Sequence, residues 1–312
     1  MKDGAPLPAA EKLAHRLTGV DAEILREALP YIRRFKGKTF VLKISGKVTE
    51  NLEVLSSLAE EIALLHQVGI RVTVVHGGGS QATQLSERLG LETKLVNGRR
   101  VTDDDTLEVV KMVFAGKISV EILSALRAFG VQAVGVSGID GNVVLARRRA
   151  KKSMMNRETG KRELIDFGNV GDVVEVDPRL LTTLLDAGYL PIVSPLAADE
   201  EGKVYNVNAD AIASALAVEL AAEKLILLSD VPGVLANAAD PESRISRLTA
   251  SDARKLAKSP AVTGGMVAKL EEISRVVEAG VSAVHIVNGN QRNALLSEVF
   301  GDTGSGTMVI GA

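Results

Sequence analysis

Residues 39–79, TFVLKISGKVTENLEVLSSLAEEIALLHQVGIRVTVVHGGG, decide the fold of this chain. The run Thr39–Ile44 is apolar apart from one lysine, which is typical of a buried strand. Leu52–Val68 repeats leucine and isoleucine every three or four residues, which predicts a helix with one apolar face. Val72–Val75 is a second apolar run, and glycines follow it. A strand, a helix and a strand in this order predict parallel strands joined by a covering helix.

The same alternation continues to the end of the chain. It predicts an α/β protein built as a three-layer sandwich, with a central, mostly parallel sheet covered by helices on both faces. The expected helices after the glycines are 80–89, 103–129, 177–187, 209–220, 251–257, 266–279 and 293–300; for 103–129 a break near Gly116 stays open. The further expected strands are 131–136, 190–193, 224–228, 283–287 and 307–310.

The segment between residues 142 and 176 departs from this alternation. Short strands at 143–146, 163–167 and 173–176 are separated by polar turns, so we expect β-hairpins that decorate the main sheet. The basic residues within 147–152 lie between these strands, and we interpret them as a solvated loop.

The N-terminal segment, residues 1–36, precedes the first strand of the core. Its apolar spacing predicts a helical arm that Gly19 and Pro30 break or kink, and we expect this arm to pack on another subunit. The remainder divides into an N-lobe, residues 37–190, and a C-lobe, residues 191–312, which share one sheet.

Composition excludes several classes of function. The chain has 312 residues, a net charge of −2 and no cysteine, so it lacks the positive field of a nucleic-acid binder, disulfides and thiolate metal sites. Its histidines are scattered, so we expect no metal site of the zinc type. No apolar run reaches the roughly 18 residues that a membrane helix needs. We therefore expect a cytoplasmic protein with neither nucleic acid nor a membrane as its partner.

The glycines Gly77–Gly79 follow a strand and open a predicted helix. Successive glycines let the backbone approach a phosphate closely, and a helix N-terminus points free N–H groups at it. A plain tight turn explains the same residues equally well. Lys43 lies inside an apolar strand and needs a partner, because an unpaired buried ammonium group is costly. That partner is either a phosphate or a structural carboxylate.

Polar residues later in the chain suggest the rest of a phosphate site. Lys269 lies about one turn into a helix after a glycine-rich stretch and could face the same phosphates, although a surface lysine is the simpler interpretation. Asn206 and Asp210 are four residues apart where a helix begins, so both can face the same way. Capping of this helix by Asn206 or Asn208 also explains the stretch. The turn after the strand at 224–228 lies where nucleotides bind in parallel sheets. Arg100 offers the planar fork that suits a carboxylate.

Taken in order, the motifs of this chain resemble those of the amino acid kinase family from about Phe35 to the C-terminus. They are VLKISG (41–46), VVHGGG (74–79), GRRVTD (98–103), NVGDVVEVDP (169–178), NVNAD (206–210), LLSDVPGVL (227–235), GGMVAKL (264–270) and GSGTM (304–308). The pattern is similar to that of members that act on N-acetyl-L-glutamate. It implies transfer of the γ-phosphoryl group of ATP, with Mg²⁺ on the phosphates, to the side-chain carboxylate of this acyl-amino acid, a step of arginine biosynthesis. A carboxylate is already ionised at pH 7, so this chemistry needs no general base.

The resemblance also implies roles for individual residues that match the family motifs. Lys43 and Lys269 would stabilise the transition state, and Asp210 would position both. Arg100 would bind the α-carboxylate of the substrate and Asn206 its N-acetyl group. Gly77 and Gly78 would flank the substrate, and the amides of Gly46 and Gly78 would hold the migrating phosphoryl group. The nucleotide set is Gly46, Ser229, Asp230, Gly233, Val234, Leu235, Gly265 and Met266.

The N-terminal arm resembles the segment that joins dimers into a hexamer in arginine-inhibited members. This implies a homo-oligomer, either a dimer or a hexamer, with arginine effector contacts at Tyr31, Glu298 and Gly304. The chain departs from the family pattern at Ser45, where a glycine is usual, and at Asn293, where we expect a histidine. The second departure counts against feedback by arginine.

Two alternatives stay open. The substrate can be another N-acyl amino acid, such as acetylaminoadipate or N-succinylglutamate, because one methylene group contributes only about 1–3 kcal/mol of discrimination. The other is a catalytically idle oligomer that senses arginine or a nucleotide. The presence of Lys43, Asp210 and Lys269 argues against that alternative.

Overall fold

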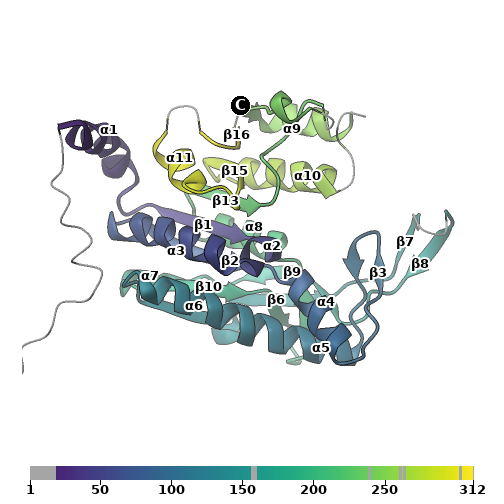
Figure 1. Cartoon of the computed structure of the whole chain (residues 1–312). Helices are drawn as coiled ribbons and strands as arrows, with labels where there is room; N and C mark the ends of the chain where they lie inside the picture. The colour runs from purple at the N-terminus through teal and green to yellow at the C-terminus, as the bar shows by residue number, and fades with distance from the viewer. Residues whose placement is uncertain are drawn as a thin grey trace, which may run out of the picture.

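A computed structural model describes residues 19–155, 160–237, 240–259, 262, 265–301 and 304–311, without the side chains of 19–25 and 241. An eight-stranded sheet forms its centre (Figure 1). Neighbouring strands are parallel throughout, except that β15 and β16 are antiparallel. In spatial order they are β14 (Arg247–Thr249), β16 (Thr307–Ile310), β15 (Ala283–Asn288), β13 (Lys224–Ser229), β1 (Thr39–Ile44), β2 (Arg71–His76), β10 (Leu190–Ser194) and β5 (Ala133–Ser137).

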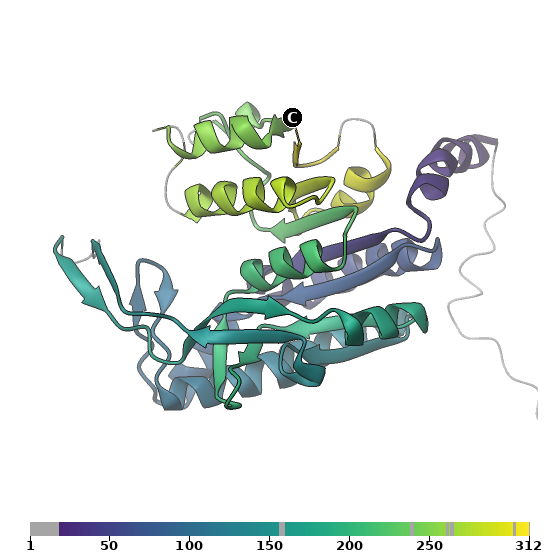
Figure 2. The same cartoon turned by 180° about the vertical axis from the view of Figure 1, so that it is seen from behind.

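Helices cover both faces of this sheet, which confirms the expected three-layer sandwich (Figures 1 and 2). One face packs on α3 (Leu52–Gln67), α6 (Ser119–Ala128) and α11 (Ala294–Phe300). The other packs on α7 (Arg179–Asp186), α8 (Ala209–Glu219), α9 (Ala250–Ala257) and α10 (Gly265–Glu278). The remaining α-helices are α1 (Gly19–Phe35), α2 (Gly46–Glu50), α4 (Gly79–Arg88) and α5 (Asp104–Lys111), and 3₁₀ turns span Asp140–Asn142 and Pro241–Ser243.

Strand β1 shows how the sequence serves both faces. Phe40, Leu42 and Ile44 join the core beneath α3, α6 and α11, whereas Val41 joins the core beneath α8 and α10. Successive side chains of a strand point to opposite faces. Lys43 therefore lies on the α8 and α10 side, where it is 9% exposed.

A small barrel and two hairpins stand beside the sheet (Figures 1 and 2). The barrel comprises β6 (Val144–Arg148), β9 (Val170–Val176), β11 (Leu196–Ala198) and β12 (Val204–Val207). The hairpins are β3 (Leu95–Val96) with β4 (Arg99–Arg100), and β7 (Lys152–Met155) with β8 (Arg162–Ile165). Strands are thus present at all three expected places, but two of them build the barrel.

Within the described residues, no break occurs at Pro30 or at Gly116. Helix α1 continues across Pro30 as one element. Pro30 is exposed, so the carbonyl group that loses its N–H partner there can bond to water. Near Gly116 the helical path continues from α5 to α6 through a π-helical turn, Met112–Ile118, which takes up an extra residue without a break. The first part of the expected arm, residues 1–18, lies outside the described residues.

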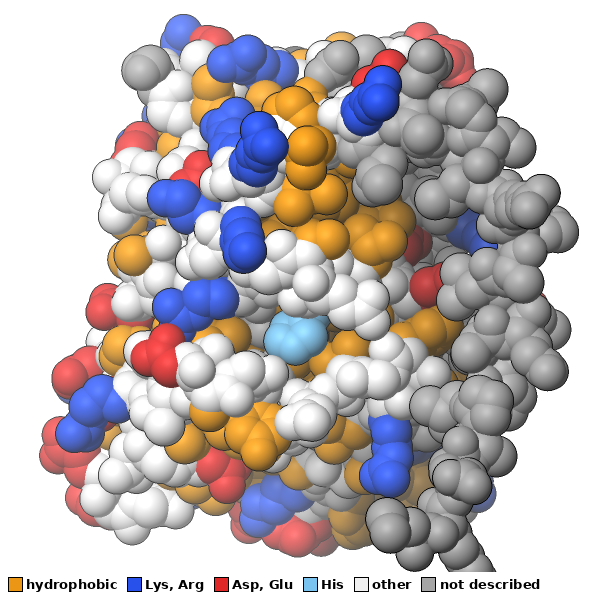
Figure 3. Space-filling model, turned by 90° about the vertical axis from the view of Figure 1, so that its left-hand side faces the viewer, with side chains coloured by type: hydrophobic (Ala, Val, Ile, Leu, Met, Phe, Trp, Pro, Cys, Tyr) orange, Lys and Arg blue, Asp and Glu red, His pale blue; other side chains and the backbone are white. Residues whose placement is uncertain are grey.

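The end of the molecule opposite the hairpins has a mixed surface. Figure 3 shows basic side chains that lie beside a hydrophobic strip on this end, with acidic side chains toward its edges. In the described ranges, no helix combines the length and the apolar character that crossing a membrane requires.

Candidate active site

A cavity of about 510 Å³ opens at the carboxyl ends of β1 and β2. Loops after these strands, the β3–β4 hairpin and the barrel form its walls. The predicted catalytic and substrate residues that line it are Lys43, Gly77, Gly78, Arg100, Asn206 and Asp210. Among the described residues of the expected nucleotide set, Gly46 alone lines this cavity.

Asp210 lies between the two lysines that the sequence singled out. Its Oδ1 is 2.7 Å from Lys43 Nζ, and its Oδ2 is 3.8 Å from Lys269 Nζ. Burial alone would raise the pKa of the Asp210 carboxyl, but the two ammonium groups hold it below its usual value. Burial also lowers the pKa of Lys269. Within this trio, one carboxylate between two cations leaves one positive charge uncompensated.

The start of α8 explains how Asp210 reaches this position. The Asn208 side chain caps the helix by accepting N–H bonds from Asp210 and Ala211 at 2.7 and 3.3 Å. Asn206 is not the cap, because its amide donates to Thr102 Oγ1 at 3.2 Å. Capping by Asn208 therefore leaves the side chain of Asp210 free to pair with the lysines, and Asn206 lines the cavity.

The glycine loop, residues 77–79, is packed so tightly at Gly78 that a side chain has no room there. A Cβ on Gly78 would lie 2.3 Å from a methyl carbon of Ile118 and 2.7 Å from the ring of Phe114. Both of these residues belong to the π-helical turn. A Cβ on Gly46 would lie 3.1 Å from Gly78 Cα, so the two loops meet backbone to backbone. Gln81, which the sequence did not single out, donates to Gly46 O at 2.8 Å and fixes this approach.

Three arginines, Arg99, Arg100 and Arg149, line the cavity. Arg100 donates to Gly79 O at 2.6 Å and to Thr83 Oγ1 at 2.5 Å, and burial lowers its pKa. Arg149 also lines the cavity and pairs with Asp172 at 2.5 Å. Its side chain is only 18% exposed, so the interpretation of residues 147–152 as a solvated loop is wrong at this position. Residue 149 follows β6 directly, and the barrel turns it inward.

Asp230 connects the expected nucleotide loop to the cavity. It follows Ser229, the last residue of β13, and pairs with Lys47 at 2.6 Å. Lys47 is the neighbour of Gly46 in the first turn of α2. The hydrogen bond from Lys47 lowers the pKa of Asp230, and the charge of Lys269 adds to this effect.

The rest of the expected nucleotide set lies along the loop after Asp230 and at the start of α10. Val234 is buried, and its N–H donates to Thr307 Oγ1 at 2.8 Å. Gly233 has a φ of +139°, and Leu235 bridges to Arg244. Gly265 and Met266 begin α10, the helix that carries Lys269.

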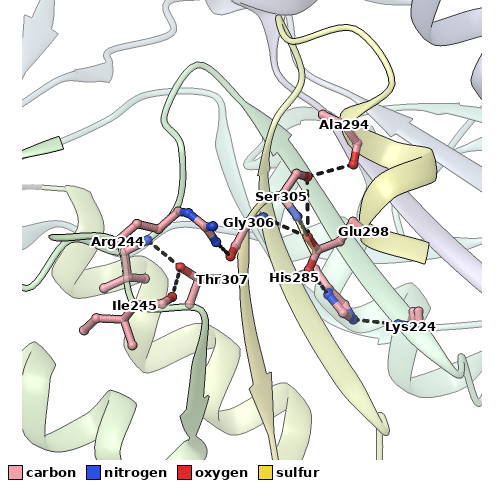
Figure 4. A network of polar contacts seen from close by, with 10 residues as sticks. Lys224, Arg244, Ile245, His285, Ala294, Glu298, Ser305, Gly306 and Thr307 are labelled. Carbon is pink, nitrogen blue, oxygen red and sulfur yellow. Dashed lines mark hydrogen bonds and ion pairs between the residues drawn. The ribbon is translucent and has the colours of Figure 1, made fainter. Parts of the chain in front are cut away.

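The expected effector residue Glu298 belongs to a second buried cluster (Figure 4). Its Oε1 lies 2.6 Å from His285 Nδ1, and its Oε2 accepts the N–H groups of Ser305 and Gly306 at 2.7 and 2.8 Å. Lys224 Nζ lies 3.0 Å from His285 Nε2. Burial would raise the pKa of Glu298, but His285 and the backbone donors hold it below its usual value.

The other expected effector residues flank this cluster. Gly304 has a φ of +62°, and a Cβ there would lie 2.7 Å from Glu298 Oε2. Tyr31 packs at the edge of the core on α1, which contacts α11. The sequence interpretation treated His285 as one of several scattered histidines. Its position within an apolar strand was the available signal, because a buried imidazole needs a partner.

Comparison with known proteins gives the family. Residues 38–288 match the model of the amino acid kinase family. This chain is a member of the amino acid kinase family. It is 45% identical to the acetylglutamate kinase of Symbiobacterium thermophilum, over 93% of this chain and 97% of that protein. It is 44% identical to the acetylglutamate kinase of Methanocaldococcus jannaschii, over 92% and 95%.

Solved structures agree with the amino acid kinase fold. The N-acetylglutamate synthase of Neisseria gonorrhoeae, complexed with coenzyme A and N-acetyl-glutamate, is 29% identical with a TM-score of 0.79. The match covers 93% of this chain but only 63% of the longer synthase. The carbamate kinase of Giardia lamblia, 18% identical with a TM-score of 0.63, shares the fold.

The charged groups of this amino acid kinase suit a metal that arrives with its nucleotide. Within the described ranges, no three His, Cys, Asp or Glu side chains gather as a metal site. Mg²⁺ in kinases is commonly held by one or two carboxylates together with the phosphates of the substrate. Asp230 and Asp210 supply carboxylates of this kind beside Lys47 and Lys269.

Proposed function

We propose that this chain transfers the γ-phosphoryl group of ATP to the side-chain carboxylate of N-acetyl-L-glutamate, in arginine biosynthesis. The observation that carries the proposal is the pairing of one carboxylate, Asp210, with Lys43 and Lys269 at the edge of a glycine-lined cavity. Identity of 44–45% with acetylglutamate kinases over nearly their full length supports the choice of substrate.

The substrate binds in the cavity through its polar groups. Arg100 receives the α-carboxylate, and its bonds to the glycine loop and α4 hold the guanidinium in place. Asn206 receives the N-acetyl group, and Gly77 and Gly78 flank the acyl chain. The side-chain carboxylate then points toward Lys43, and its ionised oxygen is the nucleophile.

The transfer step depends on positioning and on neutralisation of charge. The carboxylate attacks the γ-phosphorus as the bond to the bridging oxygen of ADP breaks. Lys43, Lys269 and the amides of Gly46 and Gly78 stabilise the charge on the transferred group, and Asp210 keeps the two lysines apart and oriented. Asp230 would help to hold Mg²⁺ that arrives with the nucleotide, and the metal would supply further neutralisation of phosphate charge.

The nucleotide lies along the edge of the sheet next to the cavity. Its contacts are Gly46, Ser229, Asp230, Gly233, Val234, Leu235, Gly265 and Met266. In this arrangement the N-lobe, residues 37–190, holds the acyl-amino acid together with Asn206 of the other lobe. The C-lobe, residues 191–312, holds ATP together with Gly46 of the N-lobe. The carboxyl ends of neighbouring parallel strands are the usual place for such ligands.

The protein acts in the cytoplasm as a homo-oligomer, a dimer or, through the N-terminal arm, a hexamer. If arginine acts as an effector, its contacts are Tyr31, Glu298 and Gly304; the asparagine at position 293 counts against this feedback. The packing of Gly304 against Glu298 supports this grouping.

Release of ADP by the purified chain tests the function. N-acetyl-L-glutamate, N-succinylglutamate, acetylaminoadipate and aspartate are compared at equal ATP and Mg²⁺. We expect kcat/KM for N-acetyl-L-glutamate to exceed that for acetylaminoadipate by about 10-fold or more, the usual effect of one methylene group. Lys43→Met is the control for contaminating kinases. Binding of ATP without turnover of any of the four acceptors would refute the proposal.

A further inference from the structure

The loop that we propose to hold the nucleotide is fastened from the last strand of the chain. Thr307 lies in β16 and is fully buried. Its Oγ1 accepts the N–H of Val234 at 2.8 Å and donates to the carbonyl oxygen of Ile245 at 2.6 Å. Ile245 N–H in turn donates to Val234 O at 2.8 Å. The Thr307 hydroxyl and this backbone bond therefore close the neck of the loop between Val234 and Ile245 together.

Packing around this hydroxyl leaves the loop little freedom. A Cβ on Gly233 would lie 2.5 Å from Thr307 Oγ1, so the loop backbone passes directly over the threonine. The positive φ of Gly233 is itself a conformation that other residues rarely adopt. Arg244, next to Ile245, donates to the carbonyl oxygen of Gly306. The loop is held at two adjacent residues of the C-terminal turn.

The same turn is fixed from its other side by Glu298. Figure 4 shows the carboxylate between His285 and the backbone of Ser305 and Gly306, with Thr307 on the side of Arg244 and Ile245. Thr307 thus connects a rigid, buried anchor to the nucleotide loop. The sequence places these partners more than sixty residues apart, so only the folded sheet brings them together.

We infer that Thr307 is a positioning residue for the nucleotide. Its hydroxyl sets the path of residues 233–235, so that their backbone meets ATP in a fixed geometry. The inference rests on the proposed function, because it takes this loop as part of the ATP site. A purely structural threonine would affect folding but would leave the balance between the two substrates unchanged.

The test removes the hydroxyl while keeping the shape of the side chain. Thr307→Val in the full chain is compared with Thr307→Ser, which restores the hydroxyl, by calorimetric titration with MgATP and by steady-state kinetics. We expect Thr307→Val to raise the Kd and KM for ATP roughly 10-fold, the size of a lost buried hydrogen bond. The KM for the acyl-amino acid should change less than about 2-fold, and Thr307→Ser should recover ATP affinity to within about 3-fold.

Thr73→Val is the matched control. Thr73 is also a fully buried strand threonine, but its hydroxyl has no partner. The same chemical change there should leave both KM values unaltered. Equal loss in Thr307→Val and Thr307→Ser would overturn the inference, as would a parallel rise of both KM values.

Two further results separate this inference from the proposed function. If the unmodified chain binds no ATP, the proposed function fails and the inference fails with it. If the unmodified chain binds ATP and Thr307→Val binds it equally well, the inference alone fails. Should Thr307→Val not fold, hydrogen exchange of the unmodified chain decides. ATP should slow exchange in residues 233–237 and 304–310 together, and protection of the first segment alone would refute the link.

Discussion

The sheet carries a buried ionic cluster on each face, and the two clusters differ in how completely their charges are paired. On the α8 and α10 side, Asp210 lies between Lys43 and Lys269 and faces a cavity. On the α11 side, both oxygens of Glu298 accept hydrogen bonds from within the protein. The first cluster keeps a cationic excess that an anion can satisfy. The second has its acceptors filled, which suits an anchor for the fold.

This contrast shows why burial of a charge alone does not mark a catalytic site. Buried ion pairs often contribute little net stability, because desolvation offsets attraction. A site for a phosphoryl group needs positive charge that is held in place but left unsatisfied. The Asp210 cluster has this character.

Removing the carboxylate charge at the centre of each cluster should give two very different losses of kcat. We expect Asp210→Asn to lower kcat about 10³-fold, because the lysines lose the group that orients them. Glu298→Gln should lower kcat by less than about 10-fold. Steady-state assays at saturating ATP and acceptor measure both. Equal losses would show that the two clusters have the same role.

Substitution of Glu298 should affect the stability of the fold more than it affects catalysis. Glu298→Gln places an amide where backbone and imidazole donors need acceptors, so we expect it to cost about 2–3 kcal/mol of unfolding free energy. Glu108→Gln removes an exposed ion pair with Lys111 and should cost less than about 0.5 kcal/mol. Urea denaturation compares the two. A cost at Glu298 as small as that at Glu108 would remove its role as an anchor.

The pH dependence of stability should reveal the lysine of the second cluster. Burial lowers the pKa of Lys224 to about 8 from 10.5, so the unfolded chain binds more protons between these values. The folded chain favours the neutral form of Lys224. The stability that goes with this neutral form is present above pH 10.5 and is lost as the pH falls toward 8. We expect the unmodified chain to gain roughly 1–3 kcal/mol relative to Lys224→Met between pH 8 and 10.5. Identical pH profiles for the two proteins would contradict the pKa shift.

A buried hydroxyl outside both clusters should give the smallest effect. Thr73 Oγ1 has no hydrogen-bond partner, so Thr73→Val removes a polar atom that the core does not use. We expect a change in unfolding free energy of no more than about 0.5 kcal/mol, or a slight stabilisation. Thermal denaturation is the measurement. A large loss would mean that Thr73 has a partner, such as buried water.

Periodicity predicted the sheet and most helices, because these depend on residues that are near neighbours in sequence. It also indicated that Lys43 needs a partner, because the lysine interrupts an apolar strand. The partner itself depends on which face Lys43 occupies and on the cap at Asn208, which brings Asp210 to the same place. Such a meeting of segments from different parts of the chain is a property of the tertiary structure.

The elements that the sequence did not predict share this long-range origin. Strand β11 is only three residues long, and its partners β6 and β12 close the barrel from two directions. His285 receives its contacts from residues 13 and 61 positions away. No local pattern carries this information. Resemblance to a family supplied Glu298 and Gly304, but not the histidine between Glu298 and Lys224.

Because side chains alternate along β1, deletion of a single residue from this strand would affect both the core and the active site. Loss of one residue between Thr39 and Lys43 would shift every upstream side chain of the strand to the opposite layer, or send the lysine beneath α3 and α11. Either Phe40 would leave the core beneath α3, or the Lys43 ammonium group would enter it. The register of β1 therefore fixes both the core packing and the position of Lys43, and a change in register alters the two together.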